Sequence, residues 1–499
     1  MRRLVIGSAV VLAAGLVAAP AAQAAEPKAK LPGLVTLKSV RQHQQALQRI
    51  SDFNGGNRAS GLPGYEISVK YVADQLKRAG YKPQVQEFEF PFFRENSPAV
   101  MEQTAPGAKT YTNATDGDFL NMEYSGPGDV TAAATAVRPG AADSGCQAAD
   151  FAGFPSGNIA IVRRGTCDFI VKAQNARDAG APAVVIFNDG ASPERTGPIA
   201  GTLGGPIDIP VIGASHAAGN ELVPLADAGT LRLHVRSDTF SEPRTTWNVI
   251  AETKAGRADN VVVVGAHLDS VQEGAGINDN GSGTAAILST AQQVNKLGGK
   301  IKNKVRFAFW GAEESGLLGS EHYVANLSEA ERDRIALNLN FDMLGSPNYV
   351  RLVYDGDGSD GGPAGPAGSG AIEKIFNDYY AGRDLPTDPT EFSGRSDYGP
   401  FIAVGIPAGG LFSGADAVKT ERQAQIYGGT AGQILDPCYH QACDDIDNTD
   451  LTILDELTDG VAFGVERFAR STLEVNGVAR TQAAFKAPAR ERVGEHWVR

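Results

Sequence analysis

Apolar segments that alternate with helical segments between residues 260 and 343 most constrain how this chain can fold. Three of them, 260–266, 304–310 and 335–343, have the length and composition of buried strands, and 284–297 and 317–327 between them are typical of helices. Apolar strands that alternate with helices indicate a buried, largely parallel sheet with helices on both faces. We therefore predict an α/β fold whose central sheet is mostly parallel. Ligands of such sheets bind beyond the carboxyl ends of the strands.

The region from about residue 115 to 240 has a different pattern. Short β-rich runs dominate it, with a helix predicted over 169–179, and it contains no cluster of histidines and carboxylates. This pattern predicts a small inserted β-rich α/β domain without chemistry of its own. Before it, 84–90 alternates like a strand, and the Thr-, Ala-, Gly- and Pro-rich stretch 103–113 marks the junction.

The N-terminus has the features of a secretory signal peptide. Arg2 and Arg3 give a basic start, 4–17 is apolar, and Ala22-Gln-Ala24 is a small-x-small cleavage site. No later segment is long and apolar enough to span a bilayer. We therefore expect a soluble, secreted, extracellular protein that is not attached to a membrane.

Charge and cysteines fit this expectation. The formal net charge of −13 disfavours nucleic acid as a partner, because an acidic protein repels phosphate. Four cysteines in a secreted chain favour disulfides, and sequence proximity suggests Cys146–Cys167 and Cys438–Cys443. A zinc knuckle is the competing interpretation, although the chain has no C-x-x-C pair.

Residues of metal-ligand type follow the ends of the three predicted strands. Taken singly, each would be interpreted as a turn or surface residue, but together they lie where the fold rule places ligands. After the strands come His267 and Asp269, then Glu313 and Glu314, then Asp342; Asp279 precedes a predicted helix, and His440 lies between two cysteines.

Two histidines and three of these carboxylates are the ligands that a pair of zinc ions requires. Each zinc takes imidazole nitrogen and carboxylate oxygen, and one carboxylate bridges the two. We predict two zinc ions per chain, held by His267, Asp279, Glu314, Asp342 and His440. Asp269 is then available to orient His267, and Glu313 to act as the general base.

These motifs resemble those of the secreted di-zinc aminopeptidases, a broad family that also contains glutamate carboxypeptidase and the transferrin receptor. The segments 394–401 and 436–444 are similar to those of actinobacterial leucine-preferring aminopeptidases. The insert resembles a protease-associated domain in 162–167 and 179–186. The resemblance covers about 31–110 and 240–475.

The resemblance implies a role for each site residue. It places His267 and Asp342 on one zinc, Glu314 and His440 on the other, and Asp279 on both. Glu313 would activate a zinc-bridged water, and Asp269 would support His267. Tyr439 would donate a hydrogen bond to the substrate carbonyl oxygen, and Arg395 would line the cleft. The competing interpretations are that Tyr439 simply packs against its neighbours and that Arg395 simply forms an ion pair with Asp397. The Cys438–Cys443 disulfide would hold Tyr439 and His440 in place.

We therefore predict a secreted, monomeric zinc aminopeptidase that acts on peptides and favours large hydrophobic N-terminal residues such as leucine. The predicted division of the chain is a signal peptide (1–24), an N-terminal catalytic part (31–114), an inserted protease-associated domain (115–240), the main catalytic part (241–475) and a peripheral tail (476–499).

Other interpretations fit the sequence less well. A di-zinc carboxypeptidase should gather arginines around the site, where Arg395 is the only obvious candidate. A binding protein with a vestigial metal site should have lost ligands. Serine-hydrolase and mono-zinc protease chemistry lack their G-x-S-x-G and H-E-x-x-H motifs. The acidic cluster of Asp444, Asp445, Asp447 and Asp450 could bind calcium, but a solvated turn is the preferred interpretation.

Overall fold

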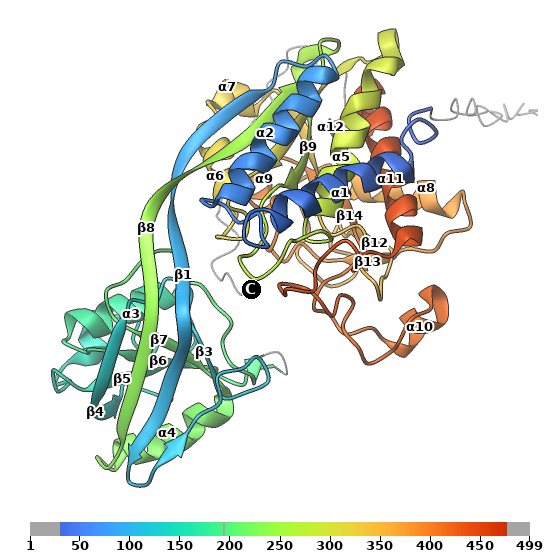
Figure 1. Cartoon of the computed structure of the whole chain (residues 1–499). Helices are drawn as coiled ribbons and strands as arrows, with labels where there is room; N and C mark the ends of the chain where they lie inside the picture. Colours follow the sequence, from blue (N-terminus) through green and yellow to red (C-terminus); the bar gives the residue numbers. More distant parts are fainter. Residues whose placement is uncertain (1–29, 193–194, 477–499) are drawn as a thin grey trace, which may run out of the picture.

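The computed structural model describes residues 30–192 and 195–476, which form two lobes (Figure 1). The predicted signal peptide lies outside the described residues, as does all of the predicted tail except Asn476. Within the described ranges, no helix has an apolar stretch that would reach across a bilayer.

The larger lobe is built on a mixed, mostly parallel sheet. Its strand order is β13-β12-β14-β11-β9-β10-β8, and β9 pairs in parallel with both β10 and β11. Only β12–β14 and β8–β10 are antiparallel neighbours in this part of the sheet as described. The strands are β8 (Arg232–Glu252), β9 (Arg257–His267), β10 (Asn303–Trp310), β11 (Ile335–Phe341), β12 (Leu352–Tyr354), β13 (Asp388–Thr390) and β14 (Ala408–Phe412).

Helices cover both faces of this sheet because its central strands are apolar on both sides. Val262 and Val264 of β9 belong to a core that includes residues of helices α1, α2, α5, α8 and α11. Val261 and Val263 face the opposite way and pack with residues of α6 and α9. These helices are α1 (Leu37–Asp52), α2 (Pro63–Arg78), α5 (Gly281–Val294), α6 (Leu318–Ala325), α8 (Ser369–Ala381), α9 (Gly399–Ala403) and α11 (Leu451–Arg470). The predicted fold class is confirmed.

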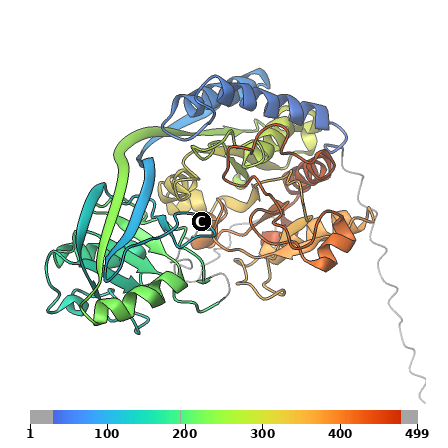
Figure 2. The same ribbon diagram turned by 60° about the horizontal axis from the view of Figure 1, so that its bottom comes forward.

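A long two-stranded ribbon joins the two lobes. β1 (Gln84–Ala105) pairs with β8 in antiparallel register from Gln84–Ile250 to Ala105–Arg232, and both views show the two strands side by side (Figures 1 and 2). The prediction of a strand over 84–90 was therefore too short. Local alternation ends near residue 90, whereas the pairing with β8 carries the strand into the second lobe.

The second lobe is a smaller α/β unit attached to the far end of the ribbon. Its sheet continues from β8 in the order β4-β5-β6-β7-β3, with α3 and α4 on opposite faces. The elements are β3 (Phe119–Asn121), β4 (Gly128–Ala136), β5 (Ile159–Arg163), α3 (Phe169–Asp178), β6 (Val184–Phe187), β7 (Val211–Ala214) and α4 (His216–Asp227). Because β1 and β8 run through both lobes, the division at 115 and 240 stays a proposal.

Short elements complete the described chain. They are β2 (Lys109–Thr110), α7 (Glu329–Arg332), α10 (Glu421–Tyr427), α12 (Leu473–Asn476) and two 3₁₀ turns, η1 (Ala148–Phe151) and η3 (Asn295–Lys300).

The start of α5 packs closely against the end of β11, so a larger residue there tests the packing of this lobe. A Cβ on Gly283 would lie 2.2 Å from the carbonyl oxygen of Phe341 and 2.3 Å from the side-chain oxygen of Asn280. We expect Gly283→Ala to destabilise the protein by about 1–3 kcal/mol, because the backbone must shift. Thermal unfolding measures this. Gly299→Ala, which adds its Cβ to open space, is the control, and equal melting temperatures would contradict the packing.

Candidate active site

Three neighbouring strands deliver side chains to one edge of the sheet. His267 is the last residue of β9, and the register places it beside Trp310, the last residue of β10. Glu313 and Glu314 lie in the turn after β10, and Asp342 follows directly after β11. The parallel register therefore brings these four side chains together, as the strand-end rule predicts.

Asp279 and His440 reach the same place from segments that are not strands. Asp279 lies just before α5, where the Asp444 carboxylate accepts hydrogen bonds from the N–H groups of Asn278 (2.8 Å) and Asp279 (2.9 Å). His440 lies in the loop closed by the Cys438–Cys443 disulfide. The second predicted disulfide, Cys146–Cys167, is also formed, in the smaller lobe.

The Asp279 carboxylate lies between the two imidazoles. Its Oδ1 is 3.2 Å from Nε2 of His267, and its Oδ2 is 3.3 Å from Nε2 of His440. Asp342 Oδ1 lies 3.3 Å from the same His267 nitrogen, and Glu314 Oε2 lies 3.2 Å from the same His440 nitrogen. The structure thus forms two groups, His267–Asp279–Asp342 and Asp279–Glu314–His440, that share one carboxylate.

The spacing and the chemistry of these groups fit zinc. Ligand atoms at about 2.0–2.1 Å from a tetrahedral zinc lie about 3.3–3.4 Å from one another, close to the separations found here. Asp342 Oδ1 and Glu314 Oε1 are buried and lack a hydrogen-bond partner. Buried carboxylate oxygens without a donor are costly unless a cation approaches them.

The electrostatics of the site favour positive charge between its carboxylates. Burial lowers the pKa of His440, but Glu314 and Asp279 outweigh burial and raise it to about 10. Burial also opposes the charged form of His267, and there Glu313 and Asp342 raise the pKa well above its usual value. A metal ion can meet the same demand, since it displaces protons from its ligands.

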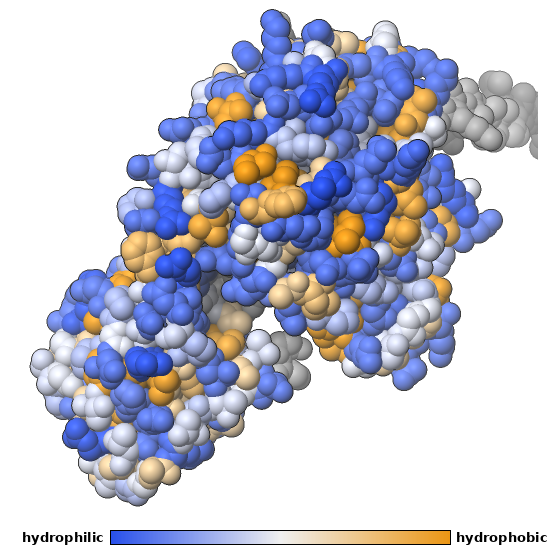
Figure 3. Space-filling model, viewed as in Figure 1, coloured by the Kyte–Doolittle hydropathy of each residue, from blue (hydrophilic) through white to orange (hydrophobic). Residues whose placement is uncertain are grey.

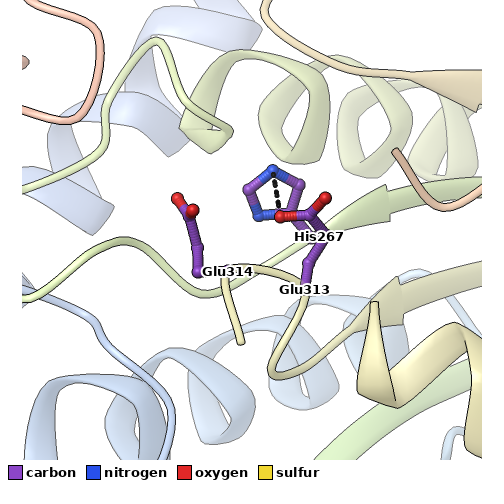
Figure 4. A group of neighbouring side chains, drawn as sticks. All are labelled: His267, Glu313 and Glu314. Carbon is purple, nitrogen blue, oxygen red and sulfur yellow. Dashed lines mark ion pairs between the residues drawn. The ribbon is translucent and has the colours of Figure 1, made fainter. Parts of the chain in front are cut away.

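The neighbouring residues Glu313 and Glu314 point in different directions from the turn after β10 (Figure 4). Glu313 Oε2 lies 3.8 Å from Nε2 of His267, whereas Glu314 faces His440. Burial, together with the carboxylates of Glu314 and Asp397, raises the pKa of Glu313 well above its usual value, although His267 acts against this rise. A buried carboxyl group with a raised pKa is suited to accept and return a proton.

Asp269 lies behind His267. Its Oδ1 is 3.6 Å from Nδ1 of His267, longer than a hydrogen bond, and it accepts the backbone N–H of Glu313 at 3.3 Å. Asp269 thus contacts both the imidazole and the turn that carries the two glutamates.

Tyr439 and Arg395 line a cavity of about 240 Å³ that opens from the site. The Tyr439 ring stacks on His440 with a centroid distance of 3.8 Å, and its hydroxyl accepts a hydrogen bond from Arg395 at 3.2 Å. Arg395 forms an ion pair with Asp416 at 3.1 Å. The sequence had suggested Asp397 as its partner instead.

Similarity to known proteins identifies the family of this chain. Residues 248–465 match the peptidase family M28 model, and an aminopeptidase of Pseudomonas aeruginosa is 46% identical over 453 residues, covering 89% of this chain and 83% of that protein. The chain belongs to peptidase family M28.

Other relatives agree with this membership. A protein of Aspergillus fumigatus named probable leucine aminopeptidase 2 is 40% identical and covers 88% of this chain and 85% of its own. Among solved structures, an aminopeptidase from Aneurinibacillus sp. strain AM-1 matches with a TM-score of 0.68 at 27% identity, covering 87% and 94% of the two chains. Residues 130–222 match the PA domain model. This M28 peptidase is a metallo-aminopeptidase, a hydrolase of peptides, with an inserted PA domain.

Sequence reasoning missed the residues that hold the ligands of this M28 peptidase in place. Arg58 is fully buried, and its guanidinium donates to three carbonyl oxygens, those of Leu268, Ala275 (2.9 Å) and Gly276 (2.6 Å). It therefore joins both ends of the segment between His267 and Asp279. Ser396 donates to Asp342 Oδ2 at 2.6 Å. Arg58 stands in no pattern that marks it in a single sequence, whereas Ser396 lies within the segment 394–401 that carries the family resemblance.

The interpretation of the acidic cluster at 444–450 as a solvated turn is corrected at one residue. Asp444 is only 2% exposed and accepts the backbone N–H groups of Asn278 and Asp279. Asp450 is half-buried and caps the start of α11. The quoted segment 436–444 contained the signal, since it placed Asp444 beside His440 and its disulfide.

Arg58 gives a direct test of how the ligands are held. We expect Arg58→Met to weaken zinc binding by about 10–100-fold, as removal of a supporting residue typically does, because three buried carbonyls lose their donor. Competition with a chelator followed by metal analysis measures the affinity. Arg49→Met, an exposed substitution on α1, is the control, and unchanged zinc affinity in Arg58→Met would contradict the role.

Proposed function

We propose that this metallo-aminopeptidase uses two zinc ions, one held by His267 and Asp342, the other by Glu314 and His440, with Asp279 shared between them. The observation that carries the proposal is the placement of one Asp279 oxygen against each imidazole, at 3.2 and 3.3 Å. A solved relative supports the metal, since it is a zinc aminopeptidase from Bacillus subtilis, which matches at 25% identity with a TM-score of 0.57 and covers 88% and 96% of the two chains.

We assign the proton transfers to Glu313. When bound, zinc supplies Lewis acidity and lowers the pKa of a coordinated water. Glu313 lies close to His267 and Glu314, one residue of each shared triad, so it is placed to take a proton from the attacking water and to return it to the leaving amine. Asp269 supports this arrangement through the N–H of Glu313.

Tyr439 and Arg395 are proposed to act on the substrate side. The Tyr439 hydroxyl lies beside the metal groups and is placed to donate to the carbonyl oxygen as it gains negative charge. Arg395 holds that hydroxyl, and Asp416 in turn holds Arg395.

The cavity at the site favours a large apolar first residue. Apolar and aromatic side chains line it beside the ligands, namely Leu317, Met343, Tyr354, Tyr398 and Phe412. A volume of about 240 Å³ is enough for a leucine side chain and its amino group. This lining supports a preference for leucine, and the names of the fungal relatives support it as well.

The charges in the same cavity favour an amine over a carboxylate at the substrate end. Besides the ligands and Glu313, Glu391 and Asp416 line it. Among the described lining residues the only arginine or lysine is Arg395, which is already paired with Asp416. A carboxypeptidase would need a free cation here, so the aminopeptidase assignment is the better fit.

Secretion and a monomeric state are also part of the proposal. The basic, apolar and Ala-x-Ala pattern of residues 1–24 supports export, and two disulfides suit an oxidising compartment. The net charge of −13 makes nucleic acid an unsuitable partner.

Paired substitutions separate the base from a ligand. We expect Glu313→Gln to lower kcat on leucine p-nitroanilide by about 100–10,000-fold while zinc content stays at two per chain, because only the proton acceptor is lost. Glu314→Gln should instead lower zinc content toward one. Steady-state kinetics and metal analysis measure both. If Glu313→Gln keeps the wild-type kcat, Glu313 is not the general base.

Blocked substrates test the requirement for a free N-terminus. We expect kcat/KM for N-acetyl-leucine p-nitroanilide to fall at least about 100-fold below that for leucine p-nitroanilide, since the acetyl group removes the ammonium charge. Lysine p-nitroanilide tests the apolar pocket. Chelation should abolish activity and added zinc restore it. Equal rates on the free and acetylated substrates would contradict the aminopeptidase assignment.

A further inference from the structure

A second cavity, of about 320 Å³, lies between the metal groups and the smaller lobe. At one end it is bounded by Glu314 and His440, and at the other by residues of the inserted lobe, including Asn121 and Gly201. The space-filling view shows the molecule hollowed between its two lobes (Figure 3).

The two cavities meet at the metal groups from different sides. Both are lined by Glu314 and His440, but only the apolar cavity is lined by Glu313 and Asp342. A peptide whose first side chain fills the apolar cavity has its scissile bond at the metal groups. Its second and third residues are then directed to the cavity between the lobes.

This second cavity is acidic. Besides the candidate ligand Glu314, three glutamates line it, Glu95 and Glu123 from the side of the ribbon and smaller lobe and Glu273 from the loop after β9, together with Asp269. Among the described lining residues there is no arginine or lysine. Burial and the neighbouring carboxylates Glu273 and Asp238 raise the pKa of Glu95, which agrees with a concentration of negative charge there.

The wall that carries Glu273 is fixed in place. Gln272 donates to the carbonyl oxygen of Phe93 on β1 at 2.6 Å, and Ser270 accepts the backbone N–H of Arg58 at 2.9 Å. Glu95 on β1 is anchored by the N–H of Ala99 at 2.8 Å. The Glu95 carboxylate and the backbone that carries Glu273 are therefore positioned before substrate arrives, which reduces the ordering needed on binding.

We propose that this cavity binds the residues that follow the scissile bond and selects peptides with lysine or arginine at the second position, with Glu95 and Glu273 as the specificity-determining residues. A lysine or arginine side chain has the length to extend from the metal groups into the cavity and the charge to offset its carboxylates. The inference rests on the proposed placement of the scissile bond.

A matched substrate series tests the proposal. The peptides are Leu-Lys-Ala, Leu-Ala-Ala and Leu-Glu-Ala, each with an amidated C-terminus, and leucine p-nitroanilide serves as a substrate without leaving-side residues. We expect wild type to cleave Leu-Lys-Ala at least about tenfold better than Leu-Glu-Ala in kcat/KM. In Glu95→Gln/Glu273→Gln the ratio should fall to about twofold or less, while kcat/KM on leucine p-nitroanilide stays unchanged. The ratio should also fall in wild type at high salt, because screening weakens charge selection.

The control variant is Glu329→Gln/Glu421→Gln, which removes two glutamates at the starts of α7 and α10, outside the cavity lining. It should keep the wild-type ratio. Equal cleavage of the three peptides by wild type, or an unchanged ratio in Glu95→Gln/Glu273→Gln, would overturn the proposal. If the wild-type protein does not hydrolyse leucine p-nitroanilide at all, the proposed aminopeptidase function itself has failed.

Discussion

The position of one carboxylate, that of Asp279 between two imidazoles, is the constraint on which the rest of the site depends. A carboxylate can serve both metal groups only if each oxygen faces a different one, so its backbone must be held on more than one side. Asp444 fixes the preceding N–H groups, and Arg58 fixes the carbonyls of the same loop. The five proposed ligands come from distant parts of the chain, and this loop is where their separate supports meet.

Such a site is unfavourable without its metal. The carboxylates of Asp279, Glu314 and Asp342 are buried close to Glu313, and like charges in a desolvated region repel strongly. Protons on the two imidazoles offset part of this in the metal-free protein, as their raised pKa values indicate. Metal binding and the ordering of these loops are therefore coupled.

The loop between β9 and α5 connects catalysis to the inserted lobe. It begins after His267 and ends at Asp279, and in between it forms a wall of the acidic cavity through Gln272 and Glu273. The ribbon of β1 and β8 carries the smaller lobe, and a hydrogen bond from Gln272 to Phe93 of β1 joins that ribbon to the wall. An insertion without metal-ligand chemistry can thus influence which peptides reach the site, because it completes a cavity that the larger lobe leaves open.

The sequence by itself determined the class of fold and supplied the candidate residues of the site. Apolar runs such as 260–266 specify buried strands locally, and the residue types at their ends limit the metals that can bind. Only the tertiary structure decided how far β1 extends, that Arg395 pairs with Asp416, and that Arg58 and Asp444 hold the loop of Asp279. The physical reason is that these contacts join residues far apart in the sequence through single hydrogen bonds and ion pairs, which leave no periodic pattern. A buried central strand such as 260–266 is encoded in its own residues, whereas the full length of β1 and the positioning contacts exist only once the fold has brought the partners together.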